Sequence, residues 1–228
     1  MSKKKIIIFF LISFIFSTNL LAYKIPDTNE IHFDIIRKGK DIGDHIINFK
    51  QKNDQLIVTV DINIKVKIAF VVVYRFEHKS IEIWKNKSLI SFSGKTIFED
   101  DREYDVSIKD LGDIYEGYGM DGKFQFPKQV LLSNYWNINV MKENQIFDTQ
   151  KGIIRETSIK DLGIVELDIN DKKIKAHKYV LNANKHPKDK GPFSETTILY
   201  DENHELIQFS FNSTKDESLI TIIRSKND

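Results

Sequence analysis

The residues of this chain that could do chemistry are histidines, hydroxyls and carboxylates, because it contains no cysteine. Metal sites need ligands at characteristic spacings. His45 lies in phase with Ile47 and Phe49, which predicts a histidine in the core or at its rim. No histidine shares a metal-ligand spacing with another or with a carboxylate cluster, so we expect no metal site. The six histidines are His32, His45, His78, His177, His186 and His204.

Catalytic and phosphate-binding motifs are incomplete. The run Ser91 to Gly94 lacks the first glycine of a nucleophile elbow. Gly117 and Gly119 are not followed by the helical pattern that a phosphate-binding loop requires. Two carboxylate pairs, at 100–101 and 201–202, lie in expected turns, where solvated side chains are usual. We therefore expect no catalytic residues, no cofactor and no enzymatic activity, and keep a hydrolase with an unrecognised site as an alternative.

Aromatic residues are the candidates for ligand binding. If the chain forms a curved sheet, large aromatic side chains on its concave face would hold an apolar, lipid-like molecule or a protein partner. The alternative is that the same side chains are ordinary core, which is the usual fate of large apolar residues. The candidate ligand-binding residues are Phe70, Tyr74, Trp84, Tyr135 and Trp136.

The stretch Leu56 to Phe76 must supply the main strand that positions these aromatics. Every even position in it is apolar, which is the period of a strand with one buried face. Its odd positions turn apolar from Ala69 to Val73, so we expect that half to be covered on both sides. A straight strand of this length would span roughly 70 Å, so it must bend or break near 65–68. We expect a turn at 77–80 and an antiparallel return from 81 to 92.

Shorter alternating runs separated by turn residues follow the pattern of a meander. We expect two strands to pair around Gly163 and a hairpin turn at Asn170 and Asp171. The segment 117–137 is apolar without a period, and is either a connection packed on the sheet edge or a lid over a cavity. We find no amphipathic helix. The sequence therefore predicts an all-β domain, an antiparallel meander whose strongly curved sheet forms a half-barrel or open barrel.

One hexamer occurs twice, as Ser107 to Gly112 and as Ser158 to Gly163. Two hairpins that share the same turn chemistry explain this repeat, and a duplicated half-domain is the alternative. A single short match has a high false-positive risk, and the similarity does not extend far beyond the hexamers.

Residues 1–22 have the pattern of a secretory signal peptide. Three lysines precede an apolar run from Ile6 to Phe16, and small residues lead to an expected cleavage after Ala22. We expect one domain at 23–228, in the periplasm. The chain has 34 Lys and Arg against 33 Asp and Glu, which does not favour nucleic acid as a partner. The signal-like pattern and the alternating strands also suit a small outer-membrane β-barrel, which is the alternative. Our main expectation is a domain that can associate with membranes but is not integral to them. The oligomeric state stays open.

Several short motifs run through the chain outside this signal. They comprise Phe33, Gly39, Gly43, the run Tyr74 to His78, Glu82 with Trp84, Leu89, Thr96, the run Tyr135 to Asn137, Gly152, Tyr179, and the run Leu199 to Asp201. As a set they resemble an uncharacterised bacterial family of exported proteins that is described as a domain of unknown function. Two positions depart from its pattern: Lys87 or Ser88 stands where the family has glycine, and Leu199 where it has an aromatic residue.

That resemblance implies a location and a fold rather than an activity. Its pattern is distantly similar to the curved half-barrel sheets of periplasmic lipoprotein and lipid carriers. This similarity leads us to expect that the concave face binds an apolar ligand. It is an analogy between folds, which does not establish a function.

Overall fold

Alternating apolar residues along most of the chain build strands with one buried face. The computed structural model describes residues 25–226, apart from 69, 170–171 and 190–192. The predicted signal peptide, with its cleavage after Ala22, and the predicted turn at 170–171 lie outside the described residues. The strands are β1 (Glu30–Arg37), β2 (Lys40–Lys52), β3 (Gln55–Ile68), β4 (Val71–Lys85), β5 (Ser88–Ile97), β6 (Glu103–Asp110), β7 (Ile114–Gly119), β8 (Gly122–Pro127), β9 (Leu131–Leu132), β10 (Gln145–Asp148), β11 (Ile153–Ile169), β12 (Lys172–Ala183), β13 (Thr196–Tyr200), β14 (Leu206–Asn212) and β15 (Leu219–Arg224).

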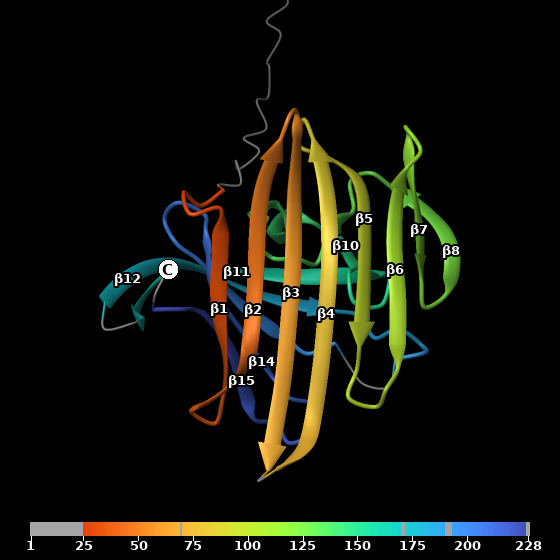
Figure 1. Ribbon diagram of the computed structural model, residues 1–228. Coiled ribbons are helices and arrows are strands. Elements are labelled where there is room, and N and C mark those ends of the chain that lie inside the picture. Colours follow the sequence, from red (N-terminus) through yellow and green to blue (C-terminus); the bar gives the residue numbers. More distant parts are fainter. Residues whose placement is uncertain (1–24, 69, 170–171, 190–192, 227–228) are drawn as a thin grey trace, which may run out of the picture.

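These strands form one strongly curved sheet, in the order β8-β7-β6-β5-β4-β3-β2-β1-β15-β14-β13-β12-β11-β10-β9. All neighbours pair antiparallel except β9 and β10, which are parallel. In Figure 1 the strands β1–β5 stand upright at the front, and β11 and β12 cross behind them. The sheet is not closed, because β8 and β9 are its edges. The predicted all-β class and open curved sheet are confirmed.

The main core fills the concave side of the sheet. It draws on nearly every strand, and its fully buried members include Phe33, Phe92, Phe147, Leu181 and Tyr200. A smaller second cluster is built around Ile169, Ala176, Leu199 and Ile207. Because the chain has no cysteine, burial of this apolar surface and the hydrogen bonds of the sheet must stabilise the fold.

The two ends of the sheet approach each other at two glycines. Gly119 ends β7, and Gly152 precedes β11. A Cβ atom on Gly119 would lie 2.3 Å from the Gly152 carbonyl oxygen, so no side chain fits there. The Met120 N–H donates to the Lys151 carbonyl across the same contact, at 2.8 Å. This backbone contact brings the β7–β8 turn onto the β10–β11 turn.

The stretch Leu56–Phe76 is not one strand but most of a hairpin. The chain reverses between the end of β3 at Ile68 and the start of β4 at Val71, so the return strand is β4 and the predicted turn at 77–80 is wrong. In the β3–β4 register Ile64 faces Phe76 and Ile62 faces His78, so even residues face even residues. This holds from the pair Leu56–Trp84 to the pair Val66–Tyr74; after a bulge at Val66, the last two pairs set an odd residue opposite an even one. The alternation therefore continues unbroken through the turn, and periodicity alone cannot reveal it.

The predicted hairpin around Gly163 is also wrong. Strand β11 runs through this position with a β-bulge between Asp161 and Ile164, and Gly163 takes the positive φ of 71° that a bulge of this kind favours. In both hexamer copies the aspartate side chain accepts from the glycine N–H two residues on, Asp110 from Gly112 and Asp161 from Gly163. The repeat thus encodes the same local bend in two settings, a hairpin turn and a bulge.

The aperiodic segment 117–137 contains the end of β7, all of β8 and β9, and a buried tryptophan. A short 3-10 helix, Ile138–Lys142, follows it, and its side chains are largely buried. Among the described residues, no helix is both long enough and apolar enough to cross a membrane.

Candidate binding cavity

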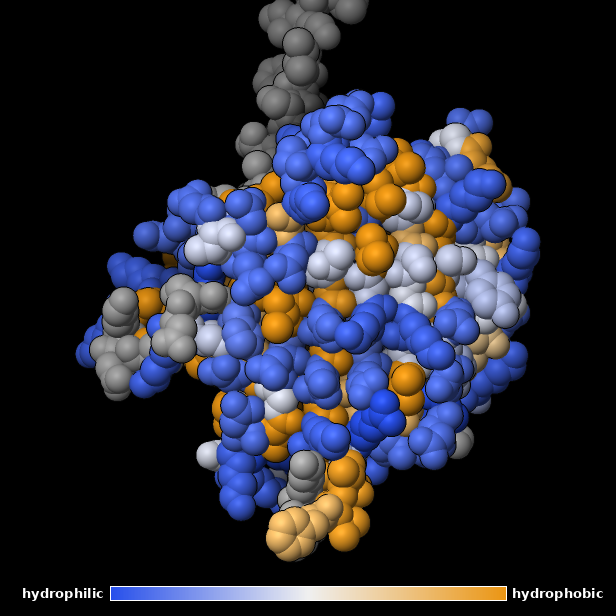
Figure 2. All heavy atoms as spheres, in the orientation of Figure 1, coloured by the Kyte–Doolittle hydropathy of each residue, from blue (hydrophilic) through white to orange (hydrophobic). Residues whose placement is uncertain are grey.

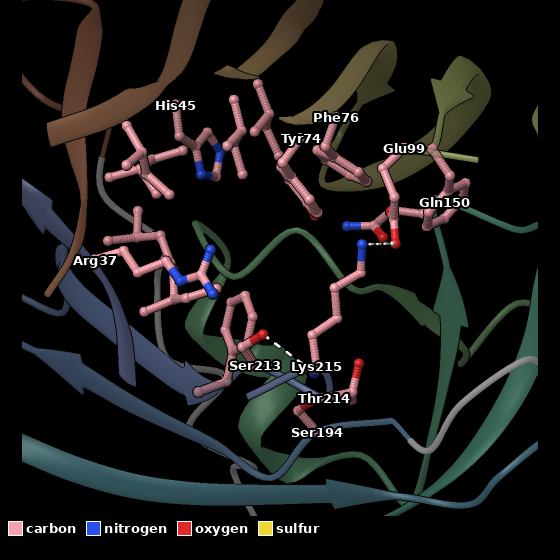
Figure 3. Close-up of a pocket in the computed structure, with 18 of the residues that line it drawn as sticks. Arg37, His45, Tyr74, Phe76, Glu99, Gln150, Ser194, Ser213, Thr214 and Lys215 are labelled. Carbon is pink, nitrogen blue, oxygen red and sulfur yellow. Dashed lines mark hydrogen bonds and ion pairs between the residues drawn. The ribbon is translucent and has the colours of Figure 1, made fainter. Parts of the chain in front are cut away.

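A cavity of about 590 Å³ opens at the end of the half-barrel where β1 ends and β4 begins. Figure 3 shows side chains from several strands and turns converging on it. Isoleucine and phenylalanine supply its walls because they occupy the inward phase of their strands. The apolar lining residues are Ile35, Ile42, Ile62, Ile64, Phe76, Phe98, Phe209, Phe211, Ile220 and Ile222.

Charged side chains from three turns surround the mouth of this cavity, and ion pairs hold them. The Lys215 ammonium lies 3.1 Å from a Glu99 carboxylate oxygen and 5.1 Å from the centroid of the Tyr74 ring. Burial and the Glu99 charge raise the pKa of Tyr74 to about 12. Arg37 pairs with Asp216 at 2.8 Å. The mouth is therefore polar and charged, whereas the walls are apolar.

Two buried imidazoles lie on the inner side of the cavity region. His45 lines the cavity and stacks at an angle between the Phe33 and Phe209 rings, with centroids 5.5 and 5.7 Å away. Neither of its ring nitrogens has a hydrogen-bond partner in the part of the chain that the structure describes. Burial, and to a lesser degree the nearby His78, lowers the pKa of His45 to about 3. Burial likewise lowers the pKa of His78 to about 4, so both rings are neutral at pH 7.

A second cavity, of about 230 Å³, shares His45, Ile62 and Phe209 with the first. Its floor holds a buried ion-pair network centred on Arg155, whose side chain is 1% exposed. The guanidinium contacts Asp148 and Asp189, each at 2.8 Å. Although burial acts the other way, hydrogen bonds from Arg155 and Lys151 hold the pKa of Asp189 well below its usual range.

A buried carboxylate joins two of the short motifs. Glu82 is fully buried, and the Trp84 indole N–H donates to its Oε2 at 2.6 Å. Its Oε1 accepts from the Asn134 amide at 2.5 Å and from the Trp136 indole at 3.2 Å. Burial raises the pKa of Glu82 to about 7, although these three hydrogen bonds favour the ionised form. The motif at Glu82 and Trp84 and the motif around Trp136 thus form one packed cluster.

The five predicted ligand-binding residues do not lie together. Tyr74 lines the larger cavity and Tyr135 the smaller one. Trp84 and Trp136 are each 3% exposed and pack into the core, as the alternative of plain core predicts for them. Phe70 is 99% exposed at the tip of the β3–β4 hairpin and lines neither cavity.

The valines after Phe70 differ from expectation in the same way. Val71, Val72 and Val73 are 66%, 43% and 48% exposed, so these valines, which we expected to be covered on both sides of the strand, are covered on neither. Their exposure follows from the reversal between β3 and β4, which places them past the last residues that pair with β2 and β5.

Sequence analysis did not predict several buried polar residues, although the alternating pattern indicated some of them. His78, Ser80 and Glu82 occupy even positions of β4, in phase with Phe76 and Trp84, so a polar residue in a buried phase was visible. The Arg155 network left no such signal, because Asp189 lies in a polar loop that pattern analysis treats as solvated. The rim or core position predicted for His45 is confirmed.

One group of potential metal ligands comes together among the described residues. Ligand atoms of His32, Asp34 and Asp44 lie within 4.8 Å of one another on β1 and β2. His32 Nε2 lies 2.9 Å from Asp44, and Asp34 accepts from the Ser225 hydroxyl at 2.5 Å. These partly exposed side chains thus already hydrogen-bond within the protein.

Comparison with known proteins places this geometry in context. A family model described as "Domain of unknown function (DUF6134)" matches residues 33–224. Among solved structures, the chain is similar to the crystal structure of a beta-barrel-like protein of domain of unknown function DUF1849 from Brucella abortus. The TM-score is 0.60 and the identity 9%, over 86% of this chain and 95% of that chain, which shows a shared fold alone. No curated protein matches the chain.

Proposed function

Because the chain belongs to the DUF6134 family, a domain of unknown function, its function has to be inferred from its own cavity, and we propose that it binds a lipid-like molecule there without transforming it. The observation that carries the proposal is the cavity of about 590 Å³ with apolar walls and a charged mouth. Pockets for small molecules have volumes of roughly 300–1,000 Å³ and are mostly apolar, with few polar groups.

The distribution of polar groups favours an amphipathic ligand. Apolar side chains of β3, β4, β14 and β15 would contact the hydrocarbon body. A polar head would lie at the mouth, where Lys215 and Arg37 can exchange part of their ion pairing for contacts with an anionic or hydroxylated group. Such a ligand buries apolar area, which is the main source of favourable free energy.

The cavity offers poor machinery for catalysis, which supports a binding role. Burial lowers the pKa values of the His45 and His78 imidazoles to about 3 and about 4, so both are weak bases. Asp148, the carboxylate on the cavity floor, is held by Arg155 at 2.8 Å and accepts from the Gln150 N–H at 2.9 Å. A general base needs a pKa near the operating pH and a reachable proton.

The test is to isolate the protein from the cells that export it and to analyse bound molecules by mass spectrometry. Wild type is expected to carry lipid-like species. Ile62 on β3 lines both cavities. Ile62→Trp therefore fills part of the cavity space, and this variant is expected to carry no lipid-like species. Ile81→Trp on the outer face of β4 is the matched control, since Ile81 is 49% exposed.

The outcomes separate the alternatives. Repeated isolation of ligand-free wild type, or equal lipid in Ile62→Trp, would overturn the binding proposal. We also propose a periplasmic location, supported by the signal-like pattern of residues 1–22. Cell fractionation tests it: release with periplasmic contents is expected, whereas retention in carbonate-washed membranes would support the outer-membrane alternative.

A further inference from the structure

The β3–β4 hairpin extends beyond the rest of the sheet. Pairing of β2 with β3 ends at Gly43 opposite Ile64, and pairing of β4 with β5 ends at Glu77 opposite Ile97. Residues between Ile64 and Glu77 therefore pair only with each other. At about 3.3 Å per residue, the hairpin extends roughly 20 Å beyond these last shared pairs. In Figure 1 it forms the lowest point of the molecule.

The tip of this hairpin is the most exposed apolar surface that the structure describes. Phe70 is 99% exposed, and Val71, Val72 and Val73 follow it with 43–66% exposure. Figure 2 shows this apolar tip projecting below a largely hydrophilic face. Single exposed apolar residues are ordinary, but a contiguous group on a protruding element marks an interaction site.

The charged residues within the protruding part of the hairpin are all basic. Between Ile64 and Phe76 the sequence holds three basic residues and no acidic one, in a chain that is otherwise balanced. Lys65 lies directly opposite Arg75 in the β3–β4 register. Like charges in that position repel each other, although Glu77 pairs with Arg75 at 2.8 Å. An anionic surface would offset this repulsion.

We propose that the β3–β4 hairpin docks the protein on an anionic lipid bilayer, with Phe70 and the following valines entering the interface and Lys65 and Arg75 contacting lipid headgroups. Interfacial elements bury apolar side chains roughly 5–10 Å deep and gain from basic residues near anionic lipids. Because its tip projects beyond the turns on either side (Figure 1), the hairpin can insert before those turns meet the lipid surface.

A second protein is a poorer occupant of this tip. A stable protein interface engages about 20–30 residues on each side, whereas the apolar tip consists of four. A narrow apolar wedge with flanking cations suits a lipid surface, into which it can insert without a matching shape. The turns that carry Arg37, Glu99 and Lys215 lie at the same end of the sheet. Docking would therefore hold the mouth of the cavity next to the bilayer.

Fluorescence quenching tests this proposal directly. Trp84 and Trp136 are both 3% exposed, so a tryptophan introduced at the surface reports on its own surroundings. Phe70→Trp is mixed with vesicles of phosphatidylethanolamine and phosphatidylglycerol that contain brominated acyl chains, and strong quenching is expected. Ile164→Trp, at a position that is 72% exposed on β11, is the matched control and should stay unquenched. Equal quenching of the two variants, or none in Phe70→Trp, would overturn the proposal.

Vesicle flotation measures how strongly the protein and its variants bind to lipid. Wild type is expected to bind vesicles containing phosphatidylglycerol, and Phe70→Ser to bind at least about tenfold more weakly, because the largest and most exposed apolar side chain of the tip is lost. Lys65→Gln should lower binding about fivefold, whereas Ile164→Ser should leave it unchanged. Equal binding to neutral phosphatidylcholine vesicles, or undiminished binding by Phe70→Ser with a wild-type melting temperature, would contradict it. Neither readout depends on a ligand in the cavity.

Discussion

The indole rings of Trp84 and Trp136 meet edge to face, with their centroids 5.7 Å apart and their planes at 85°. Both indole N–H groups donate to the same carboxylate, that of Glu82. Phe49 adds a third ring against Trp136, 5.5 Å away and again edge to face. One residue from a regular strand and one from an irregular segment thus share a single buried site.

Trp136→Ala is expected to lower the free energy of unfolding by about 3–5 kcal/mol, as much as Trp84→Ala, because each truncation opens a cavity in the same cluster. The double variant should lose less free energy of unfolding than the sum of the two single losses, because both single changes remove the same contact between the two rings. Urea denaturation measures all three values. Phe70→Ala, at an exposed position, is the control and should change stability by less than about 0.5 kcal/mol. Wild-type stability in Trp136→Ala would contradict the shared site.

Glu82→Gln should change how stability depends on pH. Because the pKa of Glu82 is raised to about 7 from 4.5, the folded protein binds a proton that the unfolded chain releases. Wild type should therefore lose stability relative to Glu82→Gln as the pH rises from about 4.5 to about 7, by about 3 kcal/mol in total.

The measurement for Glu82 is the difference between two chemical denaturation series across that pH range. His45 and His78 have lowered pKa values, so their contributions are present above pH 6.5 and are lost as the pH falls. Both proteins contain these histidines, and their contributions cancel in the difference. A difference that does not vary with pH would show that Glu82 stays ionised throughout.

Gly152→Ala should destabilise the protein by more than its backbone conformation alone explains. Gly152 has φ of 66°, and an added Cβ would lie 2.6 Å from the Gly119 Cα. Gly163→Ala is the matched control, with φ of 71° and nothing within 4 Å of an added Cβ. The control should cost about 1–2 kcal/mol for the left-handed conformation, and Gly152→Ala clearly more. Equal melting temperatures would show that the two turns can separate at little cost.

Arg155→Leu should lower the free energy of unfolding by about 3–5 kcal/mol, because it leaves Asp148 and Asp189 with buried charge that has lost its main partner. Adding Asp148→Asn should recover part of the loss. Arg102→Leu is the control, since Arg102 pairs with Asp100 near the surface and such pairs contribute roughly 0–1 kcal/mol. A loss in Arg155→Leu no larger than in Arg102→Leu would contradict a structural role for the network.

The sequence by itself determined the class of fold and the facing of most strands. Alternation has a period of two along any strand, so the buried phase of β3 was legible from Leu56 to Ile64, whereas the turn that we predicted at 77–80 interrupted the buried phase that β4 keeps from Phe76 to Trp84. Residues with turn chemistry marked most strand ends, as at the β6–β7 hairpin, where Asp110 accepts from the Gly112 N–H. The burial of Trp84 and its polar partner follow from the same local pattern.

The tertiary structure alone decided where the longest alternating stretch turns back. Up to the pair Val66–Tyr74 the hairpin pairs even residues with even residues, so its two strands carry one continuous pattern, and the turn beside Phe70 is invisible to periodicity. The same turn separates Phe70 from the other predicted site residues and leaves it exposed.

Contacts between segments that are distant in the sequence could not be predicted from the alternating pattern, for a related reason. Arg155 meets Asp189, and Trp136 meets Trp84, only because the curved sheet and its loops bring those segments together. Alternation records which face of its own strand a residue occupies, but not which residue lies opposite. That second fact depends on register and on the curvature of the whole sheet, and these two properties also create the cavity.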